Sequence, residues 1–435
     1  MPFSHTEKEY IELEKKYLIH PWGLFSPVVQ VEGKGCIMKD IQEKEYIDCL
    51  SQMAGPGGVG ISHPRVVQAV KDQVEKLACA MTWCSNIPKV QLAEKLAKIT
   101  PPGMNKFYFA TGGSEANEFA LKTAIKITGK KEVISVYLAY HGTNIALLSL
   151  SNARYREGMP LIPGFYQIPP PYCYRCPYGK VYPDCNLECA RALEEKVLFG
   201  TAHEVAAFIM EPILGPGGHI VPPPEYFTLI REICDKYGIL HIADEVQTGF
   251  GRTGKMWGMD HYKVIPDIMV VGKAMGGGVP VSAAILKEDI VTSELEKQPY
   301  HIYTFEGNPL SCAAASAVVD IVVEENIPRK AEKMGRFWFE RLKELEEKHP
   351  IIGEVRGKGL FIGVELVKDR KTKERASEET ARVLEECQRR GVLFARSNWP
   401  GNVIKIKPPI VISEDLSSQA IGVLDEALEV VEKDM

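Results

Sequence analysis

The chain has 435 residues, 45% of them hydrophobic and 25% charged, with a formal net charge of −5. These values are ordinary for a soluble globular protein, and a small negative charge gives no reason to expect nucleic acid or an anionic membrane as partner. The length exceeds one ordinary core, so we expect a large domain with smaller lobes. The polar N-terminus and the lack of any long apolar run favour a cytoplasmic protein.

The first 56 residues are expected to form an N-terminal arm that joins a small lobe. A helix is predicted over residues 7–17 and two short strands over 28–31 and 46–49. The glycine-rich segment 55–60 lacks the Lys and Ser/Thr of a nucleotide-binding loop, so we interpret it as the hinge into the large domain.

The large domain is predicted to span residues 57–316 as an α/β fold. Short apolar runs at 106–110, 133–138, 205–210, 268–271 and 281–286 are typical of strands buried on both faces of a mostly parallel sheet. Helical periodicity covers residues 66–77, 90–99 and 224–237. After an Ala-rich helix at 309–324, further helix–strand alternation predicts a small α+β domain over residues 317–435.

A glycine pair follows the strand at 106–110. The segment Thr-Gly-Gly-Ser at 111–114 then opens a helix, and we expect Ser114 to be its N-cap. Free backbone N–H groups and the positive end of a helix dipole would meet there, which suits a phosphate group. The alternative is an ordinary strand-to-helix turn.

Two further apolar runs each end in a residue that can carry chemistry. The first ends in Asp244, and the second ends in Gly272 followed by Lys273. Lysine forms Schiff bases with aldehyde cofactors near neutral pH where its surroundings lower its proton affinity. An acid can keep the nitrogen of a pyridine cofactor protonated, so that the ring withdraws electrons from a substrate carbanion. The spacing of 29 residues fits adjacent strands of an open sheet, where ligand crevices form.

The surrounding motifs resemble those of a known family. The segments Asp-Glu-Val-Gln-Thr-Gly-Phe-Gly-Arg-Thr-Gly at 244–254 and Gly-Lys-Ala-Met-Gly-Gly-Gly at 272–278 resemble the signatures of class III (ω- or acetylornithine-type) aminotransferases. These are pyridoxal-phosphate enzymes of fold type I, with a mostly parallel seven-stranded-type sheet and a small lobe built from both chain ends. Six motifs occur in family order over nearly the whole chain.

The resemblance implies where the cofactor would bind. Gly113 and Ser114 would hold its phosphate, and Tyr140 would stack on the ring beside His141, whose duty the sequence leaves open. Val246 would pack on the opposite ring face, and Gln247 would approach the ring hydroxyl.

Further residues would serve the neighbouring subunit and the substrate. By the resemblance, Thr304 reaches the cofactor phosphate of a partner subunit, so a homodimer is expected, and Glu211 lies near the substrate. Arg252 would anchor its loop. Glu306 departs from the family pattern, which commonly has a small residue there.

Lys405 is a second departure. The family's Asn-Val-x-Arg-x-x-Pro-Pro segment, whose Arg often binds a substrate carboxylate, corresponds to residues 402–409, where Lys405 replaces that Arg. An ammonium group keeps the attraction for an anion but loses the planar two-pronged recognition of a guanidinium. The substitution leaves room for another anion such as phosphate, while a solvated strand-edge lysine is the structural alternative.

Four cysteines cluster in the irregular stretch 151–190. Cys173, Cys176, Cys185 and Cys189 have the spacing C-x2-C-x8-C-x3-C, which could hold a tetrahedral zinc ion. Many metal-free loops carry such cysteines and no His-rich segment supports the site, so we predict no metal and a loop that shapes the substrate entrance.

The predicted function is ping-pong transfer of an amino group from an amine or amino acid to an oxo acid, with a Schiff base on Lys273 and with Asp244 on the ring nitrogen. The alternative on the same fold is an amino-acid racemase, an epimerase or a phospho-lyase. The test is whether an amine reaches an oxo acid.

Overall fold

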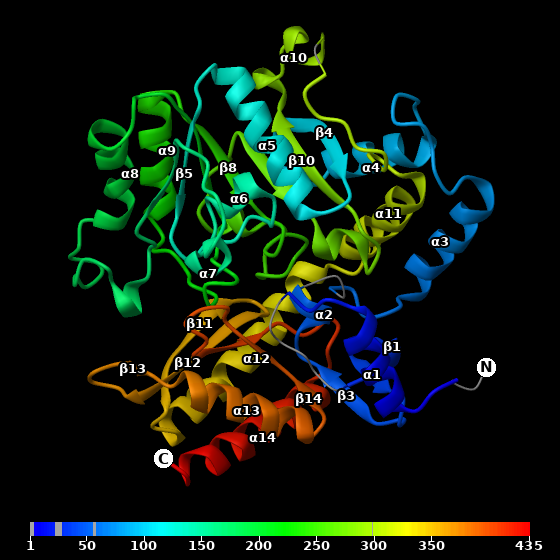
Figure 1. The fold of residues 1–435 in the computed structure, drawn as a ribbon, viewed down its shortest axis with the longest axis vertical. Helices are drawn as coiled ribbons and strands as arrows, with labels where there is room; N and C mark the ends of the chain where they lie inside the picture. Colours follow the sequence, from blue (N-terminus) through cyan, green and yellow to red (C-terminus); the bar gives the residue numbers. More distant parts are fainter. Residues whose placement is uncertain (1–3, 22–27, 55–57, 298) are drawn as a thin grey trace.

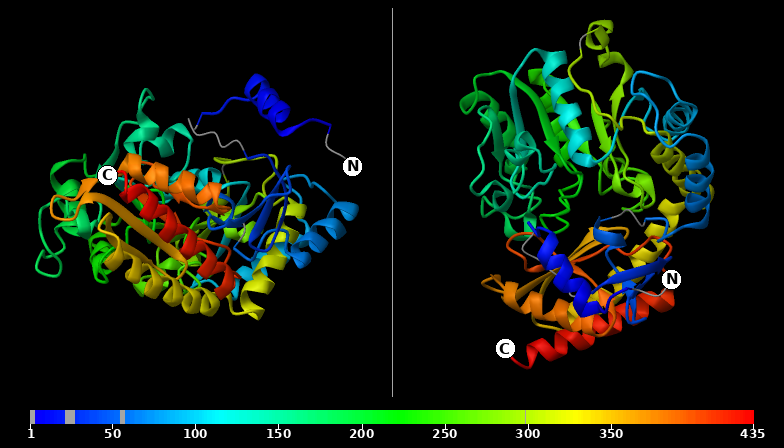
Figure 2. Two further views of the ribbon diagram at one scale, coloured as in Figure 1. Left: turned by 90° about the horizontal axis from the view of Figure 1, so that it is seen from below. Right: turned by 45° about the vertical axis from the view of Figure 1, so that its right-hand side comes forward.

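The computed structural model describes residues 4–21, 28–54, 58–297 and 299–435, and its elements form two lobes (Figure 1). The large lobe contains the sheet predicted from the apolar runs, and the small lobe gathers both ends of the chain. The turned views keep the lobes distinct and place the N-terminal helix at the periphery (Figure 2). None of the helices in the described ranges is both long enough and apolar enough to cross a membrane.

The sheet of the large lobe is mixed but mostly parallel. Within the described residues its strand order is β4-β10-β9-β8-β7-β5-β6, and β10 runs antiparallel to both neighbours while the other pairs are parallel. This confirms the predicted α/β fold class. The strands, in chain order, are β4 (Met104–Ala110), β5 (Glu132–Val136), β6 (Phe165–Ile168), β7 (Val205–Met210), β8 (Leu240–Asp244), β9 (Ile268–Val271) and β10 (Ser282–Lys287).

Both faces of this sheet are buried, which explains why its strands are continuous apolar runs. In β7, Ala207 and Ile209 join a core with helix α5 (Gly113–Thr128), whereas Phe208 and Met210 join a second core with α8 (Glu188–Phe199) and α9 (Tyr226–Tyr237). Alternate side chains of one strand point to opposite faces, so a helical layer covers each side.

Other helices complete the large lobe. Helix α11 packs on α3 and α4 and leads towards the small lobe. The bounds of these and the short helices are α3 (Pro64–Lys76), α4 (Ile87–Ala97), α6 (Ile145–Leu148), α7 (Ala153–Arg156), α10 (Ser293–Lys297) and α11 (Pro309–Glu324), with 3-10 turns at Cys173–Arg175, Gly258–His261, Lys273–Gly276 and Glu288–Ile290.

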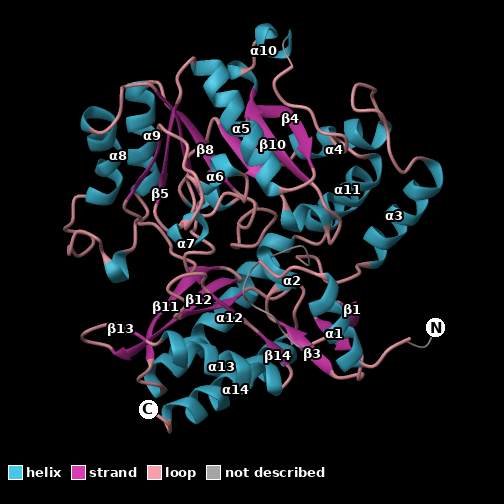
Figure 3. Ribbon diagram, viewed as in Figure 1, coloured by secondary structure: helices cyan, strands magenta, loops and turns pink. Residues whose placement is uncertain are grey.

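The small lobe has two sheets, drawn in magenta in Figure 3. One joins the strands near both chain ends, because β14 pairs in parallel with β3 of the hairpin-like N-terminal strands. The other is antiparallel in the order β11-β12-β16-β15. The strands are β1 (Gln30–Lys34), β2 (Ile37–Asp40), β3 (Glu45–Asp48), β11 (Ile352–Lys358), β12 (Phe361–Asp369), β13 (Glu374–Arg375), β14 (Val392–Leu393), β15 (Ala395–Arg396) and β16 (Val403–Ile406).

Long amphipathic helices cover this lobe. Helix α12 packs on β11, and α14 packs on both α12 and α13, so the three helices enclose the antiparallel sheet from one side. Helix α1 buries no residue. The helices are α1 (Glu7–Tyr17), α2 (Ser51–Ala54), α12 (Ile327–Lys348), α13 (Ser377–Arg389) and α14 (Glu414–Glu432).

Element boundaries follow the predictions with local exceptions. The predicted bounds of α1, β7, β9 and α11 match the structure, but β5 ends at Val136 rather than at residue 138. Ser114 was expected to cap α5, yet Gly112 is the N-cap, and the Ser114 hydroxyl accepts a hydrogen bond from the Thr143 N–H at 3.0 Å. Because glycine also reaches the extended cap backbone, the helix starts two positions earlier, at Gly113. Residues 55–57 of the proposed hinge lie outside the described residues.

Candidate active site

Asp244 and Lys273, the two residues predicted to be reactive, both line one cavity of about 340 Å³. Strands β8 and β9 are adjacent and parallel, so Asp244 and Lys273 emerge at the same edge of the sheet. This is where open α/β sheets form their ligand crevices. Other residues that line the cavity are Gly113, Ser114, Tyr140, His141, Glu211, Val246 and Gln247.

Asp244 is buried and held by three hydrogen-bond donors. Its Oδ2 lies 2.8 Å from Nδ1 of His141 and 2.9 Å from Nδ2 of Asn117, and its Oδ1 accepts the Val246 N–H at 3.1 Å. Nε2 of His141 is 3.0 Å from the Ser135 hydroxyl, which fixes the ring. These contacts fix the position of the carboxylate in the cavity, where it can face a ring nitrogen.

Lys273 sits on a sharp turn at the end of β9. Its φ of 46° lies in the left-handed region, which costs a non-glycine residue about 1–2 kcal/mol. Its side chain has no hydrogen bond or ion pair to any other described residue. Burial lowers the pKa of the ammonium, although the charges of Asp244 and Glu211 partly oppose that effect. A lowered pKa supplies the neutral amine that Schiff-base formation needs.

The start of α5 forms a cradle for an anion. Gly112 caps the helix without a side-chain hydrogen bond, so the N–H groups of the first turn have no intrahelical acceptor. A Cβ on Gly113 would lie 3.1 Å from Val246, and one on Gly142 would lie 2.3 Å from the Ser114 hydroxyl. These close approaches need glycine, and the resulting cradle fits a phosphate group.

The middle of the cavity fits a flat ring. Tyr140 and Val246 both line it, and the Tyr140 ring is steadied by Tyr155, with ring centroids 5.0 Å apart. Gln247 lines the same cavity, and its Oε1 lies 3.4 Å from Nζ of Lys407. With the cradle at one end and Asp244 and Lys273 nearby, these residues suit a phosphorylated pyridine aldehyde.

Glu211 lines the cavity, and buried Lys405 lies close enough to Glu211 and Lys273 for their charges to act on it. The two oxygens of Glu211 accept the N–H groups of Tyr140 at 3.1 Å and Gly215 at 2.9 Å. Burial and the charge of Asp244 raise the pKa of Glu211 to about 8. Burial lowers the pKa of Lys405 to about 8, against the opposing effect of Glu211.

Thr304, Glu306 and Lys405 are not among the residues that line this cavity. Thr304 is exposed, and the role expected for it concerns a second subunit. Glu306 lines a separate cavity of about 480 Å³ together with Tyr108, and burial raises its pKa. Arg252 is buried and donates to the Leu360 and Pro408 carbonyls and to the Ser51 hydroxyl, so it ties its loop to the small lobe.

The clustered cysteines are free thiols. All eleven lie in the described residues and are unpaired, and the described part of the chain has no group of three or more His, Cys, Asp or Glu side chains placed to hold a metal ion. Cys173 is exposed whereas Cys185 and Cys189 are buried. The zinc alternative has no geometric support.

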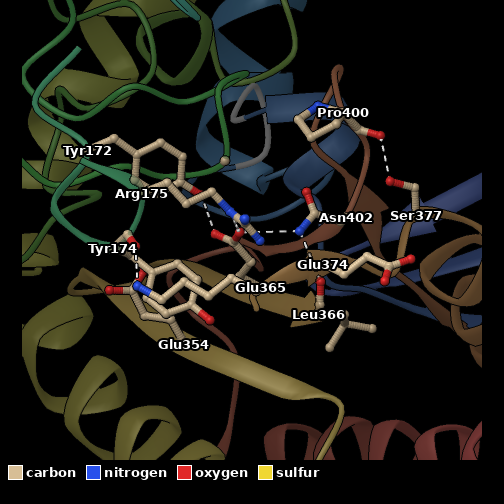
Figure 4. Close-up of polar contacts among 12 residues, drawn as sticks. Tyr172, Tyr174, Arg175, Glu354, Glu365, Leu366, Glu374, Ser377, Pro400 and Asn402 are labelled. Atoms are coloured by element: carbon tan, nitrogen blue, oxygen red, sulfur yellow. Dashed lines mark hydrogen bonds and ion pairs between the residues drawn. The ribbon is translucent and has the colours of Figure 1, made fainter. Parts of the chain in front are cut away.

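Next to this cysteine loop, a buried ionic network joins the lobes (Figure 4). The fully buried carboxylate of Glu365 on β12 accepts from Tyr172 and Arg175 of the loop and from Asn402, at 3.2 Å, just before β16. Arg356 of β11 donates to the same carboxylate at 2.6 Å. Strand β16, which carries Lys405, is thereby fixed against the large lobe.

Asn117 and Lys407 were not predicted. Asn117 donates both to Asp244 and, at 2.8 Å, to the His141 carbonyl. It lies one helical turn after Gly113, so its position on the same face of α5 was the available signal. Lys407 lies two residues after Lys405, a strand spacing that places both side chains on one face.

Comparison of the chain with known proteins identifies its family. The profile described as aminotransferase class-III matches residues 20–428. The leucine/methionine racemase of Thermococcus litoralis is 38% identical and covers 94% of this chain and 92% of that protein. The taurine–pyruvate aminotransferase of Bilophila wadsworthia is 37% identical over 99% of each. An amine transaminase structure from an uncultivated Pseudomonas species, in its PLP-bound form, has a TM-score of 0.90 at 33% identity, covering 95% of this chain and 98% of that one.

The fold and the cavity are thus those of a fold type I pyridoxal-phosphate enzyme. Within that class, the chain belongs to the class III aminotransferase family. Its cofactor is pyridoxal phosphate, and its activity is amino transfer.

Proposed function

We propose that Lys273 and Asp244 are the catalytic residues of this aminotransferase. The proposal rests on one observation: Asp244 and Lys273 follow adjacent parallel strands and line the same cavity as the start of α5, which forms the anion cradle. When bound, pyridoxal phosphate supplies an electrophilic aldehyde carbon and a ring that withdraws electrons from the substrate's α-carbon.

Different residues of the cavity would bind different parts of this cofactor. Gly113 and Ser114 would hold the phosphate, Tyr140 and Val246 would enclose the ring, and Gln247 would face its hydroxyl group. Asp244 would hold a proton on the ring nitrogen, and His141 would keep Asp244 oriented.

Lys273 would move the substrate's proton. Its lowered pKa favours the neutral amine, which can take a proton from the substrate's α-carbon. The same amine can then give the proton to the carbon atom that the cofactor aldehyde contributes. Glu211 and Lys405 would contact the substrate. Burial raises the pKa of Glu211 to about 8 and lowers that of Lys405 to about 8, so both side chains titrate in the range where the substrate's own groups change charge.

Lys273→Ala tests the assignment. The variant should bind pyridoxal phosphate without the visible absorbance of the lysine-bound form and should lose turnover by a factor of about 10³ or more. Lys255→Ala is the matched control, since Lys255 is exposed. Ping-pong amino transfer that persists in the Lys273 variant would refute the proposal.

Racemisation is the second candidate, because a relative with 38% identity is named a leucine/methionine racemase. Both reactions begin with loss of the α-proton, and they differ in where that proton is returned. Incubating the holoenzyme with a single L-amino acid, with and without an oxo acid, separates them. Amine should appear on the oxo acid, whereas D-amino acid formed without any acceptor would favour racemisation.

We further propose a cytoplasmic homodimer. Large apolar side chains are exposed around residues 81–90 and 302–305, among them Trp83 at 83% and Ile302 at 70% exposure. Such patches are typical of protein interfaces, and Thr304 lies within one of them. Light scattering should give about twice the 48.4 kDa chain mass. A fully active monomer would rule out the role of Thr304 in a second subunit.

A further inference from the structure

Two lysines, Lys405 in β16 and Lys407 just after its end, lie on the side of this segment that faces away from the core of the small lobe. Ile404 and Ile406 belong to the core of the small lobe, so Val403, Lys405 and Lys407 point the opposite way. That face packs on the segment that follows Glu211, because a Cβ on Gly218 would lie 3.0 Å from Val403. The two ammonium groups therefore lie on the side of β16 that borders the active site.

Both lysines are buried without a carboxylate partner. Lys405 is 8% exposed and Lys407 is 4% exposed, and neither makes an ion pair with any described residue. The side chain of Lys405 makes no hydrogen bond to any described residue, and the one side-chain hydrogen bond of Lys407 is the 3.4 Å contact to Gln247. A buried ammonium group without an anion is costly, which points to a ligand that supplies the charge.

The nearby acids do not supply it. Asp244 is engaged by His141, Asn117 and the Val246 N–H. Glu211 accepts two backbone N–H groups, and its raised pKa disfavours the charged form. Among the described residues, no carboxylate in this part of the site is therefore left to pair with Lys405 or Lys407.

We propose that Lys405 and Lys407 form an anion subsite for the non-reacting end of the amino substrate, and that its preferred group is a phosphoryl dianion. This inference rests on the proposed amino-transfer site and specifies its substrate class. Burial lowers the pKa of both lysines, that of Lys407 well below its usual value, so an anion beside them is what would hold their protons, and a group of charge −2 can do so for both. Point charges without a planar fork also suit a tetrahedral head group better than a planar one.

A charge series tests the subsite in the holoenzyme. The amines are 2-aminoethylphosphonate, taurine, β-alanine and propylamine, which carry a tetrahedral dianion, a tetrahedral monoanion, a planar monoanion and no anion. The rate of the cofactor absorbance change gives a specificity constant for each. We expect 2-aminoethylphosphonate to exceed propylamine about 100-fold or more, with the two monoanions between them.

Variants assign the effect to the lysines. Lys405→Met and Lys407→Met should each lower the ratio of the phosphonate constant to the propylamine constant about tenfold or more. Lys368→Met on the exposed end of β12 is the matched control and should leave that ratio unchanged. Equal constants for the phosphonate and propylamine in the unmodified enzyme, or a ratio unchanged in both lysine variants, would overturn the proposal.

An equilibrium measurement separates this inference from the proposed function. Ethylphosphonate has no amino group and should raise the melting temperature of the holoenzyme, and this rise should shrink in the Lys407 variant. If it does so while no amine changes the cofactor absorbance, the subsite stands and the proposed catalytic residues fail. If amines react but ethylphosphonate has no effect, the subsite fails alone.

Discussion

Replacing Glu365 by Gln should destabilise the protein by about 3–5 kcal/mol, because the change leaves the buried guanidinium of Arg356 and the partly buried one of Arg175 without their shared anion. Glu365 is fully buried, and Arg356, Arg175, Tyr172 and Asn402 all donate to its carboxylate. The charges of these arginines hold the pKa of Glu365 below its usual value even though burial acts to raise it. The amide keeps the size of the side chain and removes its charge.

The assay is urea unfolding followed by tryptophan fluorescence. Glu354→Gln is the matched control, since Glu354 contacts the same Arg356 but its side chain is 28% exposed, so its loss should cost less than about 1 kcal/mol. Double substitution of Glu365 and Arg175 should recover part of the lost stability, because it removes one of the unpaired charges. A loss below about 1 kcal/mol for Glu365→Gln would refute the reasoning.

Three further outcomes can be measured. Gly142→Ala should lower the free energy of unfolding by about 2 kcal/mol or more and should also lower cofactor affinity, because φ is +143° and the new Cβ would lie 2.3 Å from the Ser114 hydroxyl. Calorimetry measures the stability and cofactor titration measures the affinity. An unchanged affinity would contradict the assignment of the start of α5 as the phosphate cradle. Gly422→Ala, in α14 with open space at its Cβ, should instead stabilise by about 0.5–1 kcal/mol in the same calorimetry. Because Lys405 binds anions only as an ammonium group and its pKa is about 8, the affinity for ethanesulfonate should fall as pH rises through 8, and a dissociation constant that is flat from pH 6.5 to 9.5 would exclude this charge.

The parts of the fold that the sequence predicted are those with a local cause. Buried strands such as β7 and β9 are continuous apolar runs because both sheet faces are covered, and this pattern is visible in a single sequence. Asp244 and Lys273 could be paired in advance because adjacent parallel strands deliver their carboxyl ends to one edge. The roles assigned to individual site residues remain predictions.

The parts that the sequence did not predict depend on distant contacts. Asn117 looks like any helical residue until Asp244, 127 positions away, accepts its hydrogen bond. The Glu365 network combines residues from 172 to 402, and no periodicity relates them. Ser114 was misassigned as a cap because serine commonly fills that place, whereas its hydroxyl is used by the Thr143 N–H.

Isoleucines and lysines alternate along residues 404–407, and the two kinds of side chain face opposite sides of β16. Ile404 and Ile406 fill the interior of the small lobe, and the lysines beside them face the neighbouring lobe. Repacking behind these isoleucines would shift the backbone and displace both ammonium groups without touching them. Substitutions at Ile404 or Ile406 should therefore change the anion selectivity proposed for the lysines. These two positions are targets for engineering selectivity that lie outside the cavity.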